Sequence, residues 1–115
     1  MNPGDLEAVG AIVGRGGDAD DVLRAVVASL HEQAGYPWAG IRFVEADGLV
    51  DGPTAGEPGD APRTAVPVAW QGERVAELAV EGATDGDAPL LARVAELVSL
   101  HCLVGWDTGG EPWES

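Results

Sequence analysis

The clearest alternation of apolar and polar residues along the chain lies in two runs, Arg63–Trp70 and Arg74–Glu81, separated by Gln71 and Gly72. Alternation with a period of two places successive side chains on opposite faces of a β-sheet. A Gln-Gly pair supplies a residue that tolerates positive φ where the chain reverses. The pattern therefore predicts a β-hairpin, and this hairpin is the best-defined element in the sequence.

The two faces of the second predicted strand differ in polarity. Glu77 and Glu81 fall on one face, which is expected to meet water or a ligand. Pro67 in the first strand has no amide proton, so it favours an edge strand or a bulge. The other face of the second strand is apolar and is expected to pack on a core; its residues are Ala76, Leu78 and Val80.

Two segments have the apolar repeat of three or four residues that is typical of helices. Asp18–Ala34 begins with acidic residues that suit a helix N-terminus and is followed by Gly35, and His31 lies at the boundary of its apolar stripe. Ala88–Val104 is followed by Gly105. Its inner stripe is expected to be Leu91, Val94 and Val98. That leaves a second row directed sideways, toward solvent or another subunit: Leu90, Leu97 and His101.

The rest of the chain has weaker patterns. Trp38–Glu45 alternates as a strand, with Ala39, Ile41 and Phe43 on one face and Trp38, Gly40, Arg42 and Val44 on the other. An Asp-Gly turn over residues 46–48 leads into a short second strand, Gly48–Gly52. The stretch Pro53–Pro62 is rich in proline, glycine and acid, and it predicts an irregular loop. The segment Leu6–Val13 has glycines at both ends and predicts one or two helical turns.

The length of 115 residues predicts one domain, which we place at residues 18–105, after an N-terminal segment 1–17 and before a tail 106–115. The tail carries Trp106 and Trp113, whose indoles either stay in solvent or dock in a groove. The formal net charge of −14 disfavours binding to nucleic acid, because such a chain repels phosphate backbones. Two explanations of the negative charge stay open. It either keeps the protein soluble or reflects adaptation to a cytoplasm with a high salt concentration.

The sequence offers little catalytic or metal-binding chemistry. Cys102 is the single cysteine, which excludes an internal disulfide and fits a reducing cytoplasm. His101 and Cys102 are adjacent, so on a helix they point about 100° apart and do not converge on one metal ion. The glycines of Gly14–Gly17 have neither a preceding strand nor a following Lys-Ser or Lys-Thr, so they predict a linker. We expect no metal and no cofactor. The N-terminus lacks a basic secretory signal and a run long enough to span a bilayer, which predicts a cytoplasmic protein.

Two stretches resemble GAF domains related to free methionine-(R)-sulfoxide reductase: YPWAGIRFVEADGLVDGPTAGEP, Tyr36 to Pro58, and RTAVPVAWQGERVAELAVE, Arg63 to Glu81. That family has a tryptophan and a glycine in its first strand, a GP…G motif after the second, and a later VP(I/V)…G…V…L hairpin. The matching residues are Trp38, Gly40, Gly52-Pro53, Gly56, Val66-Pro67-Val68, Gly72, Val75 and Leu78. The resemblance spans roughly Leu23 to Val104.

The resemblance implies an α+β fold of the PAS/profilin-like type. Its antiparallel sheet has four to five strands in the order second, first, last, third, with the N- and C-terminal helices on one face. It also implies a homodimer formed through the terminal helices, which the sideways row of the second long helix would suit.

Several departures from the family pattern bear on function. The reductases place cysteines between the second strand and the later hairpin, whereas this chain has none there. Their substrate-binding Glu falls on Arg63, and their two Asp fall on Ala79 and Glu81. Because sulfoxide reduction needs a thiolate nucleophile, an enzyme is not expected. The loop 53–62 is also too short for the intervening helix of ligand-binding GAF domains.

Two functions remain open at this point. One is a non-catalytic module that forms a homodimer or binds another protein. The other is a small-molecule sensor that uses the open sheet face. In the sensor, Trp38 and Arg42 of the first strand would lie opposite Glu77 and Ala79 of the last strand, with Arg63 nearby, and would hold a small zwitterion or a planar acid. The alternative interpretation of Arg42 and Glu77 is an ordinary cross-strand ion pair.

Overall fold

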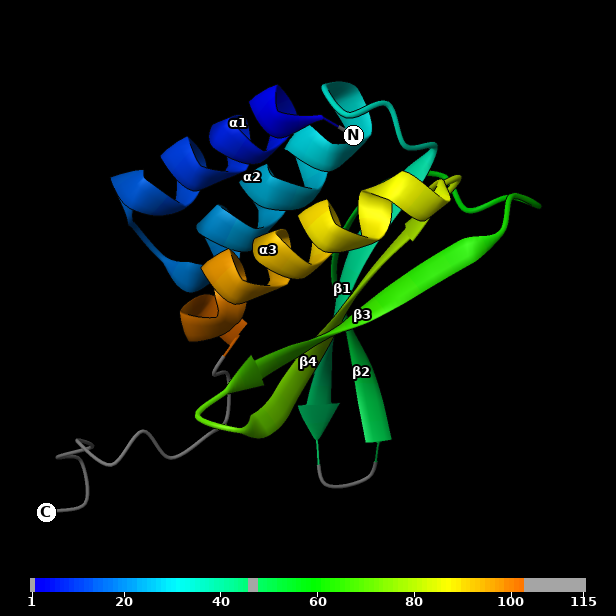
Figure 1. Cartoon of the computed structure of the whole chain (residues 1–115). Helices are drawn as coiled ribbons and strands as arrows, with labels where there is room; N and C mark the ends of the chain where they lie inside the picture. The colour runs from blue at the N-terminus through cyan, green and yellow to red at the C-terminus, as the bar shows by residue number, and fades with distance from the viewer. Residues whose placement is uncertain (1, 46–47, 103–115) are drawn as a thin grey trace, which may run out of the picture.

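The computed structural model describes residues 2–45 and 48–102. They form one antiparallel four-stranded sheet with helices on one face (Figure 1). The strands are β1 Trp38–Glu45, β2 Gly48–Gly56, β3 Arg63–Trp70 and β4 Glu73–Glu81, and their spatial order is β2-β1-β4-β3. The α+β fold and the strand order predicted from the sequence are both confirmed, and the antiparallel β1–β4 pair forms the centre of the sheet.

The central hairpin forms as the alternation predicted. Gln71 and Gly72 both have positive φ, 52° and 84°, which closes a two-residue turn between β3 and β4. β3 is an edge strand, so Pro67 lies where a missing amide proton is tolerated. Val68 pairs with Ala76 and Ala69 pairs with Arg74, so Val75 is an extra residue in β4 and forms a β-bulge. The Val75 side chain is part of the core.

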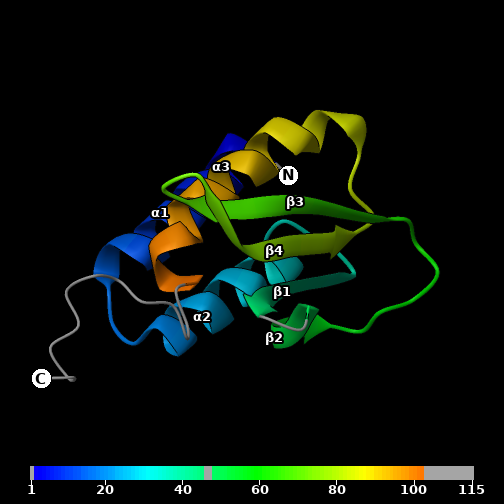
Figure 2. The same cartoon turned by 90° about the horizontal axis from the view of Figure 1, so that it is seen from below.

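Three α-helices lie on one side of the sheet: α1 Pro3–Arg15, α2 Ala19–Glu32 and α3 Ala88–Val98. α2 packs on β1 and β2, α3 packs on β3 and β4, and α1 packs on α2 and α3 (Figures 1 and 2). Two short 3₁₀ turns, η1 Asp85–Asp87 and η2 Ser99–Cys102, flank α3. The core face of the sheet includes Ile41 and Leu78, and the predicted inner residues Leu91, Val94 and Val98 are buried against it.

The N-terminal segment is more ordered than the sequence analysis predicted. In place of one or two turns, α1 is a helix of 13 residues. Asn2 and Asp5 cap it reciprocally, with the Asn2 side chain accepting from the Asp5 amide at 3.0 Å and the Asp5 carboxylate accepting from the Asn2 amide at 2.9 Å. Val9 is fully buried, so α1 contributes to the same core as α2 and α3.

Two other boundaries differ from the prediction. β2 continues to Gly56, so the predicted irregular loop is shortened to residues 57–62. Pro53 is accommodated because β2 is an edge strand and its register with β1 shifts between Gly40 and Arg42. α3 ends at Val98 and passes into η2, whereas a helix to residue 104 was predicted. The turn at residues 46–47, the stop at Gly105 and the tail 106–115 lie outside the described residues.

A buried hydrogen bond ties the entry of β1 to the start of α3. The Tyr36 hydroxyl donates to the Asp87 carboxylate at 2.8 Å. Burial raises the pKa of Tyr36 well above its usual range, and the Asp87 carboxylate raises it further. His31 Nδ1 donates to the Tyr36 carbonyl oxygen at 2.7 Å. The His31 side chain is half-buried, in line with its predicted place at the boundary of the apolar stripe.

Candidate functional site

The candidate site lies on the face of the sheet that the helices leave uncovered, called here the open face. Trp38 begins β1 on this face and is only 7% exposed. Its indole packs against Gly40, because a methyl group on Gly40 would be 2.6 Å from indole Cζ2 and 3.0 Å from Thr54 Cγ2. Gly40 therefore provides the space that holds the Trp38 ring against the sheet.

Arg63 packs over the same ring. Its guanidinium carbon lies 4.2 Å from the ring centroid of Trp38, which is a close cation–π arrangement. The guanidinium also donates from Nη2 to Glu81 Oε2 at 3.0 Å. The sheet register explains this meeting, since Glu81 of β4 is paired with Trp38 of β1 on one side and with Arg63 of β3 on the other.

Glu81 is the acidic member of this cluster, and its side chain is 3% exposed. Its Oε1 accepts a hydrogen bond from the backbone amide of Gly59 at 2.8 Å, and this bond links the β2–β3 connection to the sheet. The Gly59 amide first, and then the Arg63 guanidinium, hold the pKa of Glu81 below its usual value against the opposing effect of burial. We call Trp38, Arg63, Glu81 and Gly59 the closure cluster, because these groups fill the end of the open face.

The four predicted ligand-binding residues do not form one group. Arg42 and Glu77 are paired across β1 and β4 as expected, but Arg42 forms its ion pair with Asp51 at 3.4 Å and Glu77 forms its ion pair with Arg74 at 2.8 Å. Only Trp38 and Arg63 come together.

The expected neighbours of Trp38 also need correction. Ala79 lies opposite Gly40, so the partner of Trp38 in the register is Glu81. The sequence analysis left Glu81 out of the site. Counting in steps of two from the Arg42–Glu77 pair would have placed it opposite Trp38.

The remaining candidate residues lie on the helical side. Leu90, Leu97 and His101 are each partly exposed, and Leu97 also packs against the core. α1 also packs beside α3. Cys102 is fully buried, and burial raises the pKa of its thiol to about 12.

Within residues 2–45 and 48–102, no three His, Cys, Asp or Glu side chains gather in a way that would hold a metal ion. Across the same part of the chain, no helix combines the length and apolar character needed to cross a bilayer.

The fold has close counterparts among solved structures. Free methionine-R-sulfoxide reductase from Neisseria meningitidis, in complex with its substrate, superposes with a TM-score of 0.74 at 18% identity, over 84% of this chain and 85% of that one. The GAF domain of Acinetobacter phosphoenolpyruvate-protein phosphotransferase gives 0.70 at 11% identity, over 90% and 95%. The GAF domain of A. aeolicus nlh2 in an inactive state gives 0.72 at 10% identity, over 88% and 94%. No family profile matches the sequence, and no curated protein is similar to it. The chain thus has the fold of a GAF domain, as the resemblance in sequence predicted.

Proposed function

We propose that this chain is a non-catalytic, cytoplasmic GAF-like module that acts by associating with protein, either a second copy of itself or another chain. The observation that carries the proposal is the position of Arg63. Its side chain lies on the Trp38 ring and is bonded to Glu81, so the aromatic surface and the carboxylate that would recognise a small molecule are engaged within the chain. With the aromatic end of the open face filled in this way, the other surfaces of the domain are the better candidates for its function.

The state of the only thiol supports the absence of catalysis. A thiol with a pKa of about 12 is almost entirely protonated near neutral pH, and a buried thiol does not reach a substrate. The test is direct: the purified chain is incubated with free methionine-R-sulfoxide and a thiol reductant. We expect no turnover and no rise in melting temperature, and a reduction that Cys102→Ser abolishes would overturn the proposal.

The homodimer is proposed to form through the helical side. Leu90, Leu97 and His101 are partly exposed on α3 and η2, and burying apolar surface contributes about 25 cal/mol per Å². The charge of −14 on each copy opposes association, so added salt should tighten the dimer by screening it. Light scattering with increasing salt is the measurement. Leu97→Glu would place a carboxylate of each subunit in the contact and should give a monomer.

Since Leu97 also packs against the core, a second variant is needed. Leu90→Gln changes another partly exposed residue of the same row and should also weaken the dimer, and far-UV circular dichroism checks that both variants are folded. A wild-type chain that stays monomeric at high protein concentration and high salt would contradict the dimer. In that case the proposed partner would be another protein and not a second copy of this chain.

The second candidate function is a sensor whose ligand displaces Arg63. It is favoured by one observation, that a buried carboxylate and an indole make a suitable receptor for a cation once Arg63 leaves. Arg63→Ala would open this receptor. Free arginine and methylated ammonium compounds are the probes, with melting temperature as the readout. Stabilisation of the wild type by these compounds would favour the sensor over the interaction module.

A further inference from the structure

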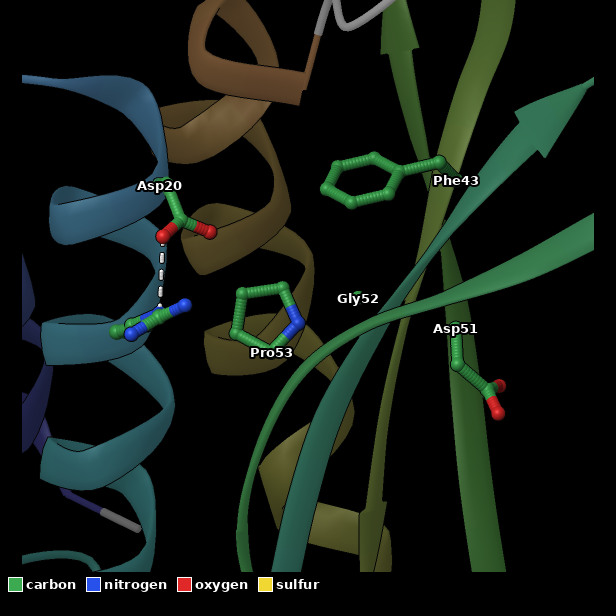
Figure 3. Close-up of a pocket in the computed structure, with 6 residues that line it drawn as sticks. Asp20, Phe43, Asp51, Gly52 and Pro53 are labelled. Carbon is green, nitrogen blue, oxygen red and sulfur yellow. Dashed lines mark ion pairs between the residues drawn. The ribbon is translucent and has the colours of Figure 1, made fainter.

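The β2 edge of the sheet carries a cavity that the closure cluster does not involve. It has a volume of about 320 Å³ and lies between the beginning of α2 and the strands β1 and β2. Phe43 and Pro53 point into the space between the sheet and α2, and the Asp20–Arg24 ion pair forms the opposite wall (Figure 3). Asp51 also lines it, but its carboxylate lies on the far side of β2 from α2.

The apolar floor of this cavity is built into the strands. The Phe43 ring lies against the backbone of β2, because a methyl group on Gly52 would be 2.6 Å from Phe43 Cε2. The ring stays only partly buried. Val50 is paired with Phe43 across the strands, so its side chain is on the same face, and it is 49% exposed. Within the described residues, the exposed large apolar side chains are Leu49 and Val50, both on β2.

β2 is also an edge strand, so alternate backbone amides and carbonyls face outward with no partner strand from residues 2–45 or 48–102. Natural proteins usually protect such an edge with charge or proline, or cover it. Pro53 protects only the far part of β2, which leaves Gly48–Asp51 as an extended stretch with apolar side chains on both faces. An edge of this kind is suited to the addition of one more strand.

The charges around the β2 edge favour a partner segment with positive charge. The Asp51 side chain is 86% exposed, and its link to Arg42 is long, at 3.4 Å. Asp20 and Arg24 are also largely exposed. Exposed ion pairs contribute little to stability. A cation of the partner can therefore replace Arg42 at Asp51, or Arg24 at Asp20, at small cost in free energy. Since the chain carries −14 overall, a second copy of this chain is disfavoured at this edge and a basic segment is favoured.

We propose that the Gly48–Asp51 edge of β2 docks an extended segment of a partner protein in which basic and apolar residues alternate. The segment pairs with β2 as a fifth strand. Its apolar side chains lie on Val50 and enter the cavity at Phe43 and Pro53, and its lysines or arginines lie on the open face beside Asp51. This inference rests on the proposed function, because it names the chemistry of the partner of an interaction module.

The test uses two capped peptides of identical composition. One alternates lysine and valine, and the other carries the same residues in two blocks, so the charge is equal and only the alternation differs. Binding to the full chain is followed by fluorescence anisotropy at physiological salt. The alternating peptide should bind at least about tenfold more tightly than the block peptide, because only its side chains fit both faces of a strand.

Matched variants locate the contact. Val50→Asp should weaken binding of the alternating peptide at least about tenfold. Ala11→Asp, which adds the same charge at an exposed position of α1, should not weaken it. Asp51→Asn should weaken it about two- to fivefold, and Glu32→Gln, with the same change of charge at the end of α2, should have a smaller effect.

Three results would overturn the inference: equal binding of the two peptides, no binding of either, or binding that Val50→Asp leaves unchanged. Light scattering on the same samples separates this failure from failure of the proposed function. If the dimer persists while the alternating peptide fails to bind, only the inference that the β2 edge docks a partner is refuted. Turnover of a substrate, with peptide binding that Val50→Asp weakens, refutes only the non-catalytic proposal.

Discussion

Replacing Gly40 with alanine is expected to destabilise the protein, although alanine usually suits a folded chain better than glycine. The added methyl group would lie 2.6 Å from Cζ2 and 2.8 Å from Cη2 of Trp38. The ring cannot simply swing away, because the Arg63 guanidinium packs over it and Trp38 is almost fully buried. Relief of the clash therefore requires the indole and Arg63 to shift together.

The magnitude follows from two opposing effects. Overpacking a well-packed position costs about 1–3 kcal/mol. Loss of glycine from the unfolded chain returns about 0.4–1 kcal/mol. The free energy of unfolding should thus fall by about 1–2 kcal/mol, which corresponds to roughly 4–8 °C in melting temperature for a domain of this size.

The assay is urea unfolding followed by far-UV circular dichroism. Gly14→Ala is the matched control, because it makes the same chemical change in α1 where no atom lies within 4 Å of the added methyl group. It should stabilise the helix by about 0.5–1 kcal/mol. In a Trp38→Leu background the penalty for Gly40→Ala should shrink to less than about half, since the ring is its main cause. A Gly40→Ala protein as stable as the wild type would refute the packing of Trp38 on Gly40.

Three further outcomes follow from the geometry. Gly56→Ala should lower the stability of the fold more than Gly40→Ala. Gly56 has a φ of 83°, and its added methyl group would clash with the carbonyl oxygen of Pro37, a backbone atom that cannot rotate away. Melting temperatures of the two variants check this order. The lowered pKa of Glu81 stabilises the fold above the unfolded value of about 4.3 and is lost as pH falls through the folded value, so urea midpoints measured down to about pH 3 should fall less steeply for Glu81→Gln. Cys102 should resist alkylation by iodoacetamide at about pH 8 in the native protein and react fully in urea, whereas rapid native alkylation would contradict its burial.

The sheet could be predicted from sequence because its signals are local. The Gln71-Gly72 pair fixed the β3–β4 hairpin, and the resemblance to GAF domains supplied the order of the strands. α1 was underestimated because Gly10 and Gly14 weaken helix propensity, although Asn2 with Asp5 was a readable capping signal. Tertiary packing through Val9 outweighed that weak propensity.

The candidate site was harder to predict, because it depends on register and not on pattern. Alternation assigns Trp38 and Glu81 to the same face of the sheet, but only the pairing of β1 with β4 brings them opposite each other. The resemblance to the reductases aligned Arg63 with their substrate-binding Glu. That its side chain would fill the site depends on a stacking distance and a bond to a buried carboxylate, which no sequence pattern encodes.

The short β2–β3 connection gives a physical reason for the closure cluster. β2 and β3 are opposite edges of the sheet, so the connection must pass across three strand spacings, or about 14 Å. The seven steps from Gly56 to Arg63 reach at most about 23–25 Å, which leaves too little slack for a helix or a lid. Gly59, near the middle of this span, is tied to Glu81, and the chain then enters β3 with Arg63 above Trp38. The short connection therefore explains why this end of the open face is filled, and lengthening the connection is the change that would be needed to open a small-molecule site here.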